Sequence, residues 1–157
     1  MKDNPLISIV LPTYNVAPFL KQCLESVANQ TYENYEAIII VDGATDGSYE
    51  IAQKFCDLHS KFTVIWQENA GSGPARNNGI KHANGDFVMF VDPDDWIDSD
   101  LLEKLYEGQK TGDYDLVATM KSNATCDENG EILSFSPQHY KEREIIGKEF
   151  LRNEFLE

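Results

Sequence analysis

The segment from Asp86 to Trp96 constrains the fold most, because an apolar run ends there abruptly on a group of acids. Phe87 to Val91 is short, continuously apolar and rich in aromatic and branched residues, which predicts a strand buried on both faces. The carboxylates that follow at once are those of Asp92, Asp94 and Asp95. Crowded carboxylates repel one another unless a positive group lies among them. The segment therefore predicts a strand whose carboxyl end holds a divalent cation.

The rest of the chain alternates predicted strands with predicted helices. Apolar runs predict strands at 7–11, 36–41, 62–66, 87–91 and 115–120, the first of them closed by Pro12. Apolar residues at helical spacing predict helices at 18–28, 48–59 and 74–83, and a fourth from an N-cap at Ser99 to Gly112. Farther on, we expect a turn at 127–130, an edge strand at 132–135 and a terminal helix at 147–155. This alternation favours an α/β fold, a mostly parallel sheet with helices on both faces, in one domain over residues 1–157.

Composition excludes some classes of partner. The 157 residues carry 13 Lys plus Arg against 27 Asp plus Glu, a formal net charge of −14. Long-range attraction to nucleic acid or to an anionic membrane is therefore not expected. The cysteines, Cys23, Cys56 and Cys126, lie far apart and form no zinc or disulfide pattern. With neither a signal peptide nor a membrane-spanning apolar run in the sequence, we expect a cytoplasmic location.

Polar groups follow several predicted strands. Thr13, Tyr14 and Asn15 follow the first, Asp42 the second and the acidic group the fourth. In an open α/β sheet these carboxyl ends meet at one edge, where ligands bind. Carboxylate oxygens suit Mg²⁺ or Mn²⁺, and Mg²⁺ usually takes only one or two carboxylates, with phosphate oxygens and water completing the shell. The pattern predicts a phosphorylated ligand that shares the metal, with Arg76 near a helix start as a phosphate-binding cation.

Other acid-rich sites fit the sequence less well. A calcium-binding EF-hand loop counted from Asp92 would place Trp96 at a ligand position and Ile97 where the sharp turn needs glycine. A phosphate-accepting receiver domain would want acids after the first strand, where Thr13, Tyr14 and Asn15 stand instead. Dinucleotide binding would want a Gly-x-Gly-x-x-Gly after that strand, and the sequence has none there.

Together, five stretches of sequence resemble the family 2 glycosyltransferases of the GT-A (Rossmann-like) fold. The resemblance covers about residues 5–117 and rests on Ser8 to Asn15, Leu24 to Tyr32, Ile40 to Ser48, Asn69 to Ile80 and Phe90 to Trp96. It implies an enzyme of cell-surface polysaccharide biosynthesis. The expected reaction is an inverting transfer of a sugar from a nucleoside diphosphate to a glycan or lipid-linked acceptor. The expected nucleoside diphosphate is UDP. Peripheral membrane association is expected of the full enzyme only.

The resemblance also assigns roles to residues. Thr13, Tyr14, Asn15, Asp42, Arg76 and Asp92 are the expected donor-binding residues, with Asp42 near the base. Asp92 and Asp94 form the Asp-x-Asp motif that would hold Mn²⁺ or Mg²⁺, with Asp94 as the direct ligand and Asp95 in a structural role. Val41 stands where the family usually has a further acid.

The resemblance assigns no catalytic residue to this chain. An inverting transfer needs a carboxylate that takes the proton of the acceptor hydroxyl. The later acidic motif that supplies this base in the family has no counterpart between Thr119 and Glu157. We therefore expect a domain truncated at its acceptor-binding and catalytic-base part. Two hypotheses stay open: an enzyme, or a module that binds donor and metal without catalysing transfer.

Overall fold

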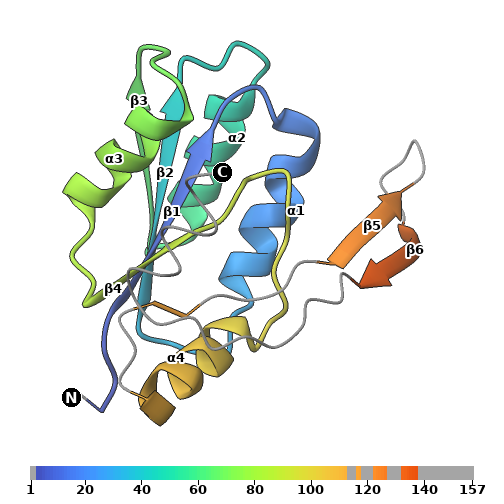
Figure 1. Ribbon diagram of the computed structural model, residues 1–157. Helices are drawn as coiled ribbons and strands as arrows, with labels where there is room; N and C mark the ends of the chain where they lie inside the picture. The colour runs from blue at the N-terminus through green and yellow to red at the C-terminus, as the bar shows by residue number, and fades with distance from the viewer. Residues whose placement is uncertain (1–2, 113–115, 118–121, 127–131, 138–157) are drawn as a thin grey trace, which may run out of the picture. The chain divides into compact units, whose positions relative to one another are not determined.

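The computed structural model of the protein describes residues 3–112, 116–117, 122–126 and 132–137. The chain divides after Glu103 into two compact units, 1–103 and 104–157. The first unit contains a four-stranded sheet with helices packed on it (Figure 1).

All neighbouring strands of this sheet run parallel. The strands are β1 (Ile7–Thr13), β2 (Tyr35–Asp42), β3 (Phe62–Gln67) and β4 (Phe87–Phe90), in the order β3-β2-β1-β4. Central β1 and β2 are almost wholly buried, as expected of apolar strands covered on both faces. The predicted parallel α/β sheet is confirmed.

Helices cover both faces of the sheet, as predicted. They are α1 (Ala17–Ala28), α2 (Ser48–Leu58) and α3 (Ser72–His82). Figure 1 shows α3 on one face, and α1 and α2 together on the other. Helix α3 begins two residues before the predicted start at Pro74, because the first turn of a helix tolerates proline. A fourth helix, α4 (Leu101–Gly112), begins in the first unit and continues into the second.

Strand β1 does not end at Pro12, as the sequence predicts, but continues through it to Thr13. The pairing of β1 with β4 stops at Val10, opposite Phe90, whereas its pairing with β2 continues to Thr13. Pro12 therefore lies where, among the described strands, one side of β1 has no partner, and proline is tolerated in a strand at such an edge.

Strand β4 is less buried than its apolar sequence predicts. Val88 is 41% exposed and Phe90 is 42% exposed, so the prediction of a strand buried on both faces is wrong here. The physical reason is its place in the sheet: among the described strands, β4 pairs with β1 alone and forms an edge. Arg76 lies over the ring of Phe90, 6.0 Å from its centroid, and covers part of this face.

Beyond α4 the second unit contains an antiparallel pair, β5 (Ser122–Cys126) and β6 (Ile132–Pro137). The predicted edge strand at 132–135 is confirmed as part of β6, whereas β5 was not predicted. The strand predicted at 115–120 lies mostly outside the described residues, and its two described residues, Leu116 and Val117, belong to no strand. The turn predicted at 127–130 and the helix at 147–155 also lie outside the described residues.

Helix α3 packs against the sheet through a glycine. A β-carbon added at Gly79 would clash with the side chain of Val10, approaching Cγ2 to 3.0 Å and Cγ1 more closely still. Val10 is fully buried among Ile38, Ile40 and Ala75, so it has little room to move. Glycine at this position therefore lets α3 lie close enough to the sheet to bring Arg76 over β4.

The change Gly79→Ala should lower the free energy of unfolding by about 1–3 kcal/mol, the usual cost of overfilling a packed core. Urea denaturation followed by circular dichroism measures it. Gly73→Ala is the matched control in the same helix, because a β-carbon there meets no atom within 4 Å. If the two variants were equally stable, Gly79 would not be needed for this packing.

Candidate functional site

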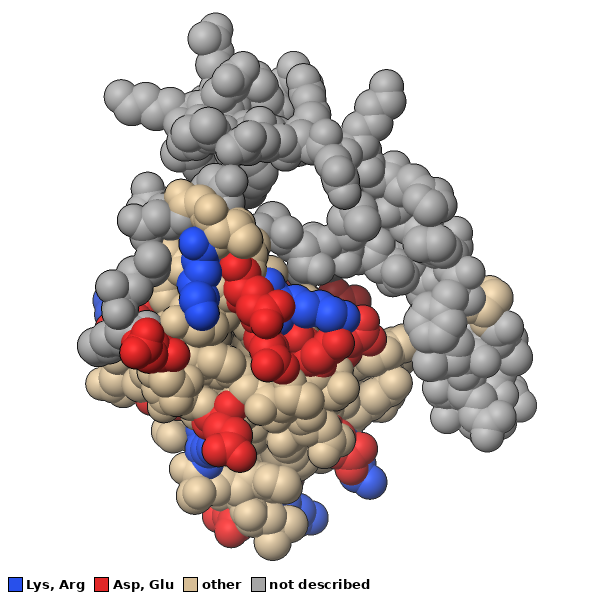
Figure 2. All heavy atoms as spheres, turned by 90° about the horizontal axis from the view of Figure 1, so that it is seen from below, with Lys and Arg blue, Asp and Glu red and all other residues tan. Residues whose placement is uncertain are grey.

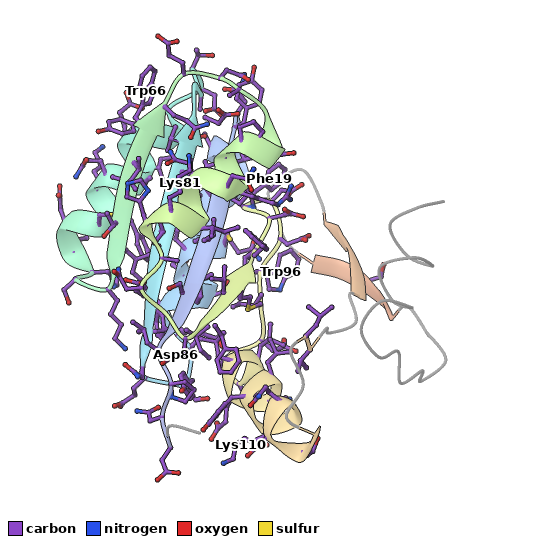
Figure 3. All side chains as sticks on the ribbon, turned by 60° about the vertical axis from the view of Figure 1, so that its left-hand side comes forward. Phe19, Trp66, Lys81, Asp86, Trp96 and Lys110 are labelled. Atoms are coloured by element: carbon purple, nitrogen blue, oxygen red, sulfur yellow. The ribbon has the colours of Figure 1, made fainter. Side chains whose placement is uncertain are left out.

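The carboxyl ends of β1, β2 and β4 lie side by side at one end of the sheet. Thr13 pairs with Val41 and Val10 pairs with Phe90, so Asp42, the last residue of β2, and Asp92, two residues after β4, lie at the same end of the sheet. Trp66, near the end of β3, lies at this end in Figure 3, and Asp86 lies at the opposite end. The structure thus gathers the strand-end residues named from the sequence.

Asp42 is buried and holds the loop that leads into α3. Its side chain and backbone are only 3% exposed. Oδ1 accepts hydrogen bonds from the Ala70 N–H at 2.9 Å and from Gln67 Nε2 at 2.7 Å, and Oδ2 accepts one from the Gly71 N–H at 2.8 Å. Gly71, with φ of 94°, caps the helix. The carboxylate therefore fixes the start of α3.

Gln67 is a site residue that the sequence reasoning missed. Its amide nitrogen donates to Asp42, and its amide oxygen accepts a 2.7 Å hydrogen bond from Asn78 Nδ2 in α3. It thus joins β2, β3 and α3. The available signal was weak: a polar residue at the end of an apolar strand, a position that most often only begins a loop.

Arg76 and Asp92 form the ion pair at the centre of the site. Arg76 Nη2 lies 2.7 Å from Asp92 Oδ1, and the two side chains are 34% and 42% exposed. A guanidinium carries five N–H donors, and this ion pair engages one of its nitrogens. Arg76 can therefore bind an anionic ligand while it still contacts Asp92.

The other acids of the group have different surroundings. Asp94 is exposed and makes no hydrogen bond or ion pair within the part of the chain that the structure describes. The Asp95 N–H donates to the Asp92 carbonyl at 2.9 Å and closes a turn. We name residues 92–95 the acidic turn. Its geometry leaves the carboxylate of Asp94 available to a cation.

Cys23 packs beneath the acidic turn. Its Sγ lies 3.9 Å from the Asp92 carbonyl oxygen, which accepts from the thiol. Burial raises the pKa of Cys23 to about 12, and the negative charges of Asp95, Asp94 and Asp92 add to that rise. Its thiol therefore stays protonated at neutral pH and donates to the backbone of the acidic turn.

The three residues at and just after the end of β1 differ in their contacts. The Thr13 side chain is buried, and its hydroxyl donates to the Leu11 carbonyl at 3.1 Å. Asn15 has a φ of 49°, and its Oδ1 accepts from the Thr45 N–H at 2.9 Å. Tyr14 is 50% exposed. Tyr14 and Asn15 are therefore exposed residues, whereas Thr13 is buried.

Asp46 joins the loop after β1 to the loop after β2. Its Oδ2 accepts from the Ala17 N–H at 2.8 Å, and its Oδ1 accepts from the N–H and the hydroxyl of Ser48. Ser48 Oγ in turn accepts from the Val16 N–H at 3.1 Å. The sequence reasoning missed Asp46, although an Asp just before a predicted helix is a common N-terminal signal.

The donor set suits a metal shared with a ligand. No group of three or more His, Cys, Asp or Glu side chains is arranged to hold a metal by itself among the described residues. Asp92 and Asp94 provide two carboxylates, the number that Mg²⁺ usually takes when phosphate and water complete its shell. The residues present therefore fit a divalent ion that a phosphorylated ligand helps to bind.

The described surface carries no extended basic area on the face that Figure 2 shows, where acidic and basic side chains lie intermixed. Within the same described residues, no helix is both long and apolar enough to cross a bilayer.

An open parallel sheet with an arginine and an acidic turn at its carboxyl edge defines an α/β protein with its polar site where such sheets bind ligands. The family described as glycosyl transferase family 2 matches residues 8–152. This chain belongs to that family, and its fold is the predicted GT-A fold.

Similar proteins agree with this membership. Glycosyltransferase GlyA of Streptococcus pneumoniae is 45% identical over 101 residues, which are 64% of this chain and 14% of GlyA. The structure of S. aureus TarS 1-349 in complex with UDP-GlcNAc is 31% identical with a TM-score of 0.67, over 73% of this chain and 34% of that one. The mannosyltransferase PcManGT of Pyrobaculum calidifontis, in complex with GDP-Man and Mn2+, is 25% identical with a TM-score of 0.64, over 69% and 33%. This chain thus spans only a minor part of each.

The change Asp46→Asn should make stability less sensitive to acid. Burial alone would raise the pKa of Asp46, but hydrogen bonds from Ser48 and Ala17 outweigh it and lower the pKa. A lowered folded-state pKa means that the stabilisation is present above the unfolded pKa, about 3.9, and is lost as the pH falls through the folded pKa. Urea unfolding at several pH values from 7 down to about 3 measures the slope.

Glu68→Gln, which removes an exposed carboxylate, is the control for the Asp46→Asn experiment. A slope in Asp46→Asn as steep as in the parent chain would show that these hydrogen bonds do not link the loops in solution.

Proposed function

We propose that this chain is the donor-binding part of an inverting glycosyltransferase, which transfers a sugar from a nucleoside diphosphate to a glycan or lipid-linked acceptor in polysaccharide biosynthesis. The observation that carries the proposal is the Arg76–Asp92 ion pair beside the open carboxylate of Asp94, at the carboxyl edge of a parallel sheet. The donors named with TarS and PcManGT, UDP-GlcNAc and GDP-Man, support a nucleotide sugar as the substrate class.

In this proposal, Arg76 and the acidic turn bind the diphosphate. When a sugar leaves a nucleoside diphosphate, negative charge grows on the departing phosphate oxygens. Arg76 is oriented by Asp92 and can donate to those oxygens, which favours the transition state over the ground state. A divalent ion held by Asp92 and Asp94 would supply further positive charge there. Mn²⁺ or Mg²⁺ is the cofactor that these oxygen ligands suit.

Asp42 is the residue proposed to recognise the nucleotide base by a hydrogen bond. A carboxylate has about four acceptor positions, and the loop hydrogen bonds use three of them. The position left on Oδ2 suits a ring N–H, which uracil offers at N3. This is the reason for proposing UDP as the nucleotide. In this proposal Tyr14, which is exposed after β1, contacts the nucleotide as well.

No residue of this chain is assigned as the base that takes the proton from the acceptor hydroxyl. Turnover therefore separates the enzyme from the binding module. Release of UDP from a panel of UDP-sugars is the measurement: turnover would reject the module, and metal-dependent binding without turnover would support it.

UDP should bind more tightly with Mn²⁺ than with EDTA, and Asp94→Ala should remove that difference. The reason is that Asp94 is the open carboxylate of the acidic turn. Isothermal titration calorimetry of UDP under both conditions is the measurement, with Asp57→Ala in α2 as the control. An unchanged metal effect in Asp94→Ala would exclude Asp94 as a ligand. A parent chain that binds no UDP in either condition would contradict the proposed function.

The nucleotide 3-methyl-UDP should bind at least about tenfold more weakly than UDP, the cost of losing one hydrogen bond to a charged acceptor. Its methyl group replaces the N3–H that Asp42 would accept. The matched control is 5-methyl-UDP, which carries a methyl group on the same ring and keeps the N3–H. Equal affinity for UDP and 3-methyl-UDP would remove Asp42 from base recognition.

A further inference from the structure

A buried glutamine at the end of α1 forms hydrogen bonds with the segment that follows the acidic turn. Gln30 is almost fully buried. Its Nε2 donates to the Asp98 carbonyl at 2.7 Å and to the Ser26 carbonyl at 3.1 Å, and its Oε1 accepts from the Leu102 N–H at 3.1 Å. One amide group thus holds both ends of the chain segment that leads into α4.

Two neighbours of Gln30 add further hydrogen bonds to the same segment. Ser26 Oγ accepts from the Ile97 N–H at 3.1 Å and donates to the Cys23 carbonyl at 2.7 Å. The Thr31 N–H donates to the Ser99 carbonyl at 2.8 Å. The backbone of residues 97–102 is therefore tied to residues 26–31 at four of its polar groups.

The other end of the acidic turn is fixed by the sheet. The Val91 N–H donates to the Val10 carbonyl at 3.1 Å, which continues the pairing of β4 with β1. Residues 92–96 therefore bridge two fixed points, one on the sheet and one at the end of α1. Within the described residues Asp94 makes no hydrogen bond or ion pair, so in this part of the chain the backbone between these two points positions its carboxylate.

We infer that Gln30 and Ser26 are positioning residues for the metal and diphosphate site: they hold residues 97–102 so that the carboxylates of the acidic turn meet the cation at the right place. The inference rests on the proposed function and adds to it a set of residues that touch neither metal nor nucleotide. A displacement of about 1 Å in such a site can change activity about a hundredfold, so a small loosening of this anchor is measurable.

Gln30→Met tests the inference, because methionine has a similar length and cannot replace these hydrogen bonds. The Kd for UDP in Mn²⁺ should rise by about tenfold or more, while the Kd in EDTA should stay within about twofold. Amide hydrogen exchange at Ile97 and Leu102, followed by NMR without metal, should become faster. Ser26→Ala should shift both measurements in the same direction.

Gln53→Met is the matched control, a glutamine on α2 whose side chain contacts Tyr49 and Asp57 instead. It should change neither measurement. Circular dichroism checks that each variant is folded, and if Gln30→Met is not, Ser26→Ala decides the question. An equal loss of UDP affinity with and without metal would show a structural role only and would overturn the inference.

The outcomes separate the inference from the function on which it rests. If the parent chain binds UDP with metal and the anchor variants bind equally well, the inference is wrong and the proposed function stands. If the parent chain binds no UDP in either condition, the proposed function fails and the inference fails with it.

Discussion

The buried carboxylate of Asp42 is the interaction on which the rest of the site depends. A buried charge is unfavourable unless hydrogen bonds replace its water, and here two backbone N–H groups and the Gln67 amide do so. The N–H groups of Ala70 and Gly71 lie at the start of α3, where the helix dipole also favours a negative charge. Asp42 therefore sets where α3 begins and, five positions after Gly71, where Arg76 lies.

Arg76 then connects helix α3 to the acidic turn after β4. It extends from α3, which packs on β1 and β2, to Asp92 at the end of β4. An ion pair this exposed contributes only about 0–1 kcal/mol to stability. Its value is geometric: it orients a guanidinium whose remaining N–H groups can meet phosphate oxygens, and it keeps Asp92 from repelling Asp94 and Asp95 at full strength. The sequence predicts a divalent cation among these acids and Arg76 as a phosphate-binding cation; the structure pairs Arg76 with Asp92, and the divalent cation stays a prediction.

The fold and the main acids could be predicted because each rests on a local signal. Runs such as Ile38 to Val41 are apolar on both faces, which is typical of a covered parallel strand, and acids that follow such a run lie at the carboxyl edge of the sheet by topology. The exposure of Val88 and Phe90 could not be predicted, since it depends on which strand lies at the edge. The roles of Gln67 and Gln30 could not be predicted either, because their hydrogen-bond partners lie far away in the sequence and come close only in the folded chain.

The acidic turn is held on its two sides by different interactions. This explains how a short exposed segment can still have a well-defined position. On one side the sheet fixes Val91 through strand pairing, and Arg76 reaches Asp92 from α3. On the other side, Gln30 and Ser26 fix Ile97 to Leu102 through the end of α1. The Arg76–Asp92 ion pair and these backbone hydrogen bonds together place the turn. The exposed carboxylate of Asp94 can therefore stay open to a cation, while rigid elements on both faces of the sheet determine where the turn lies.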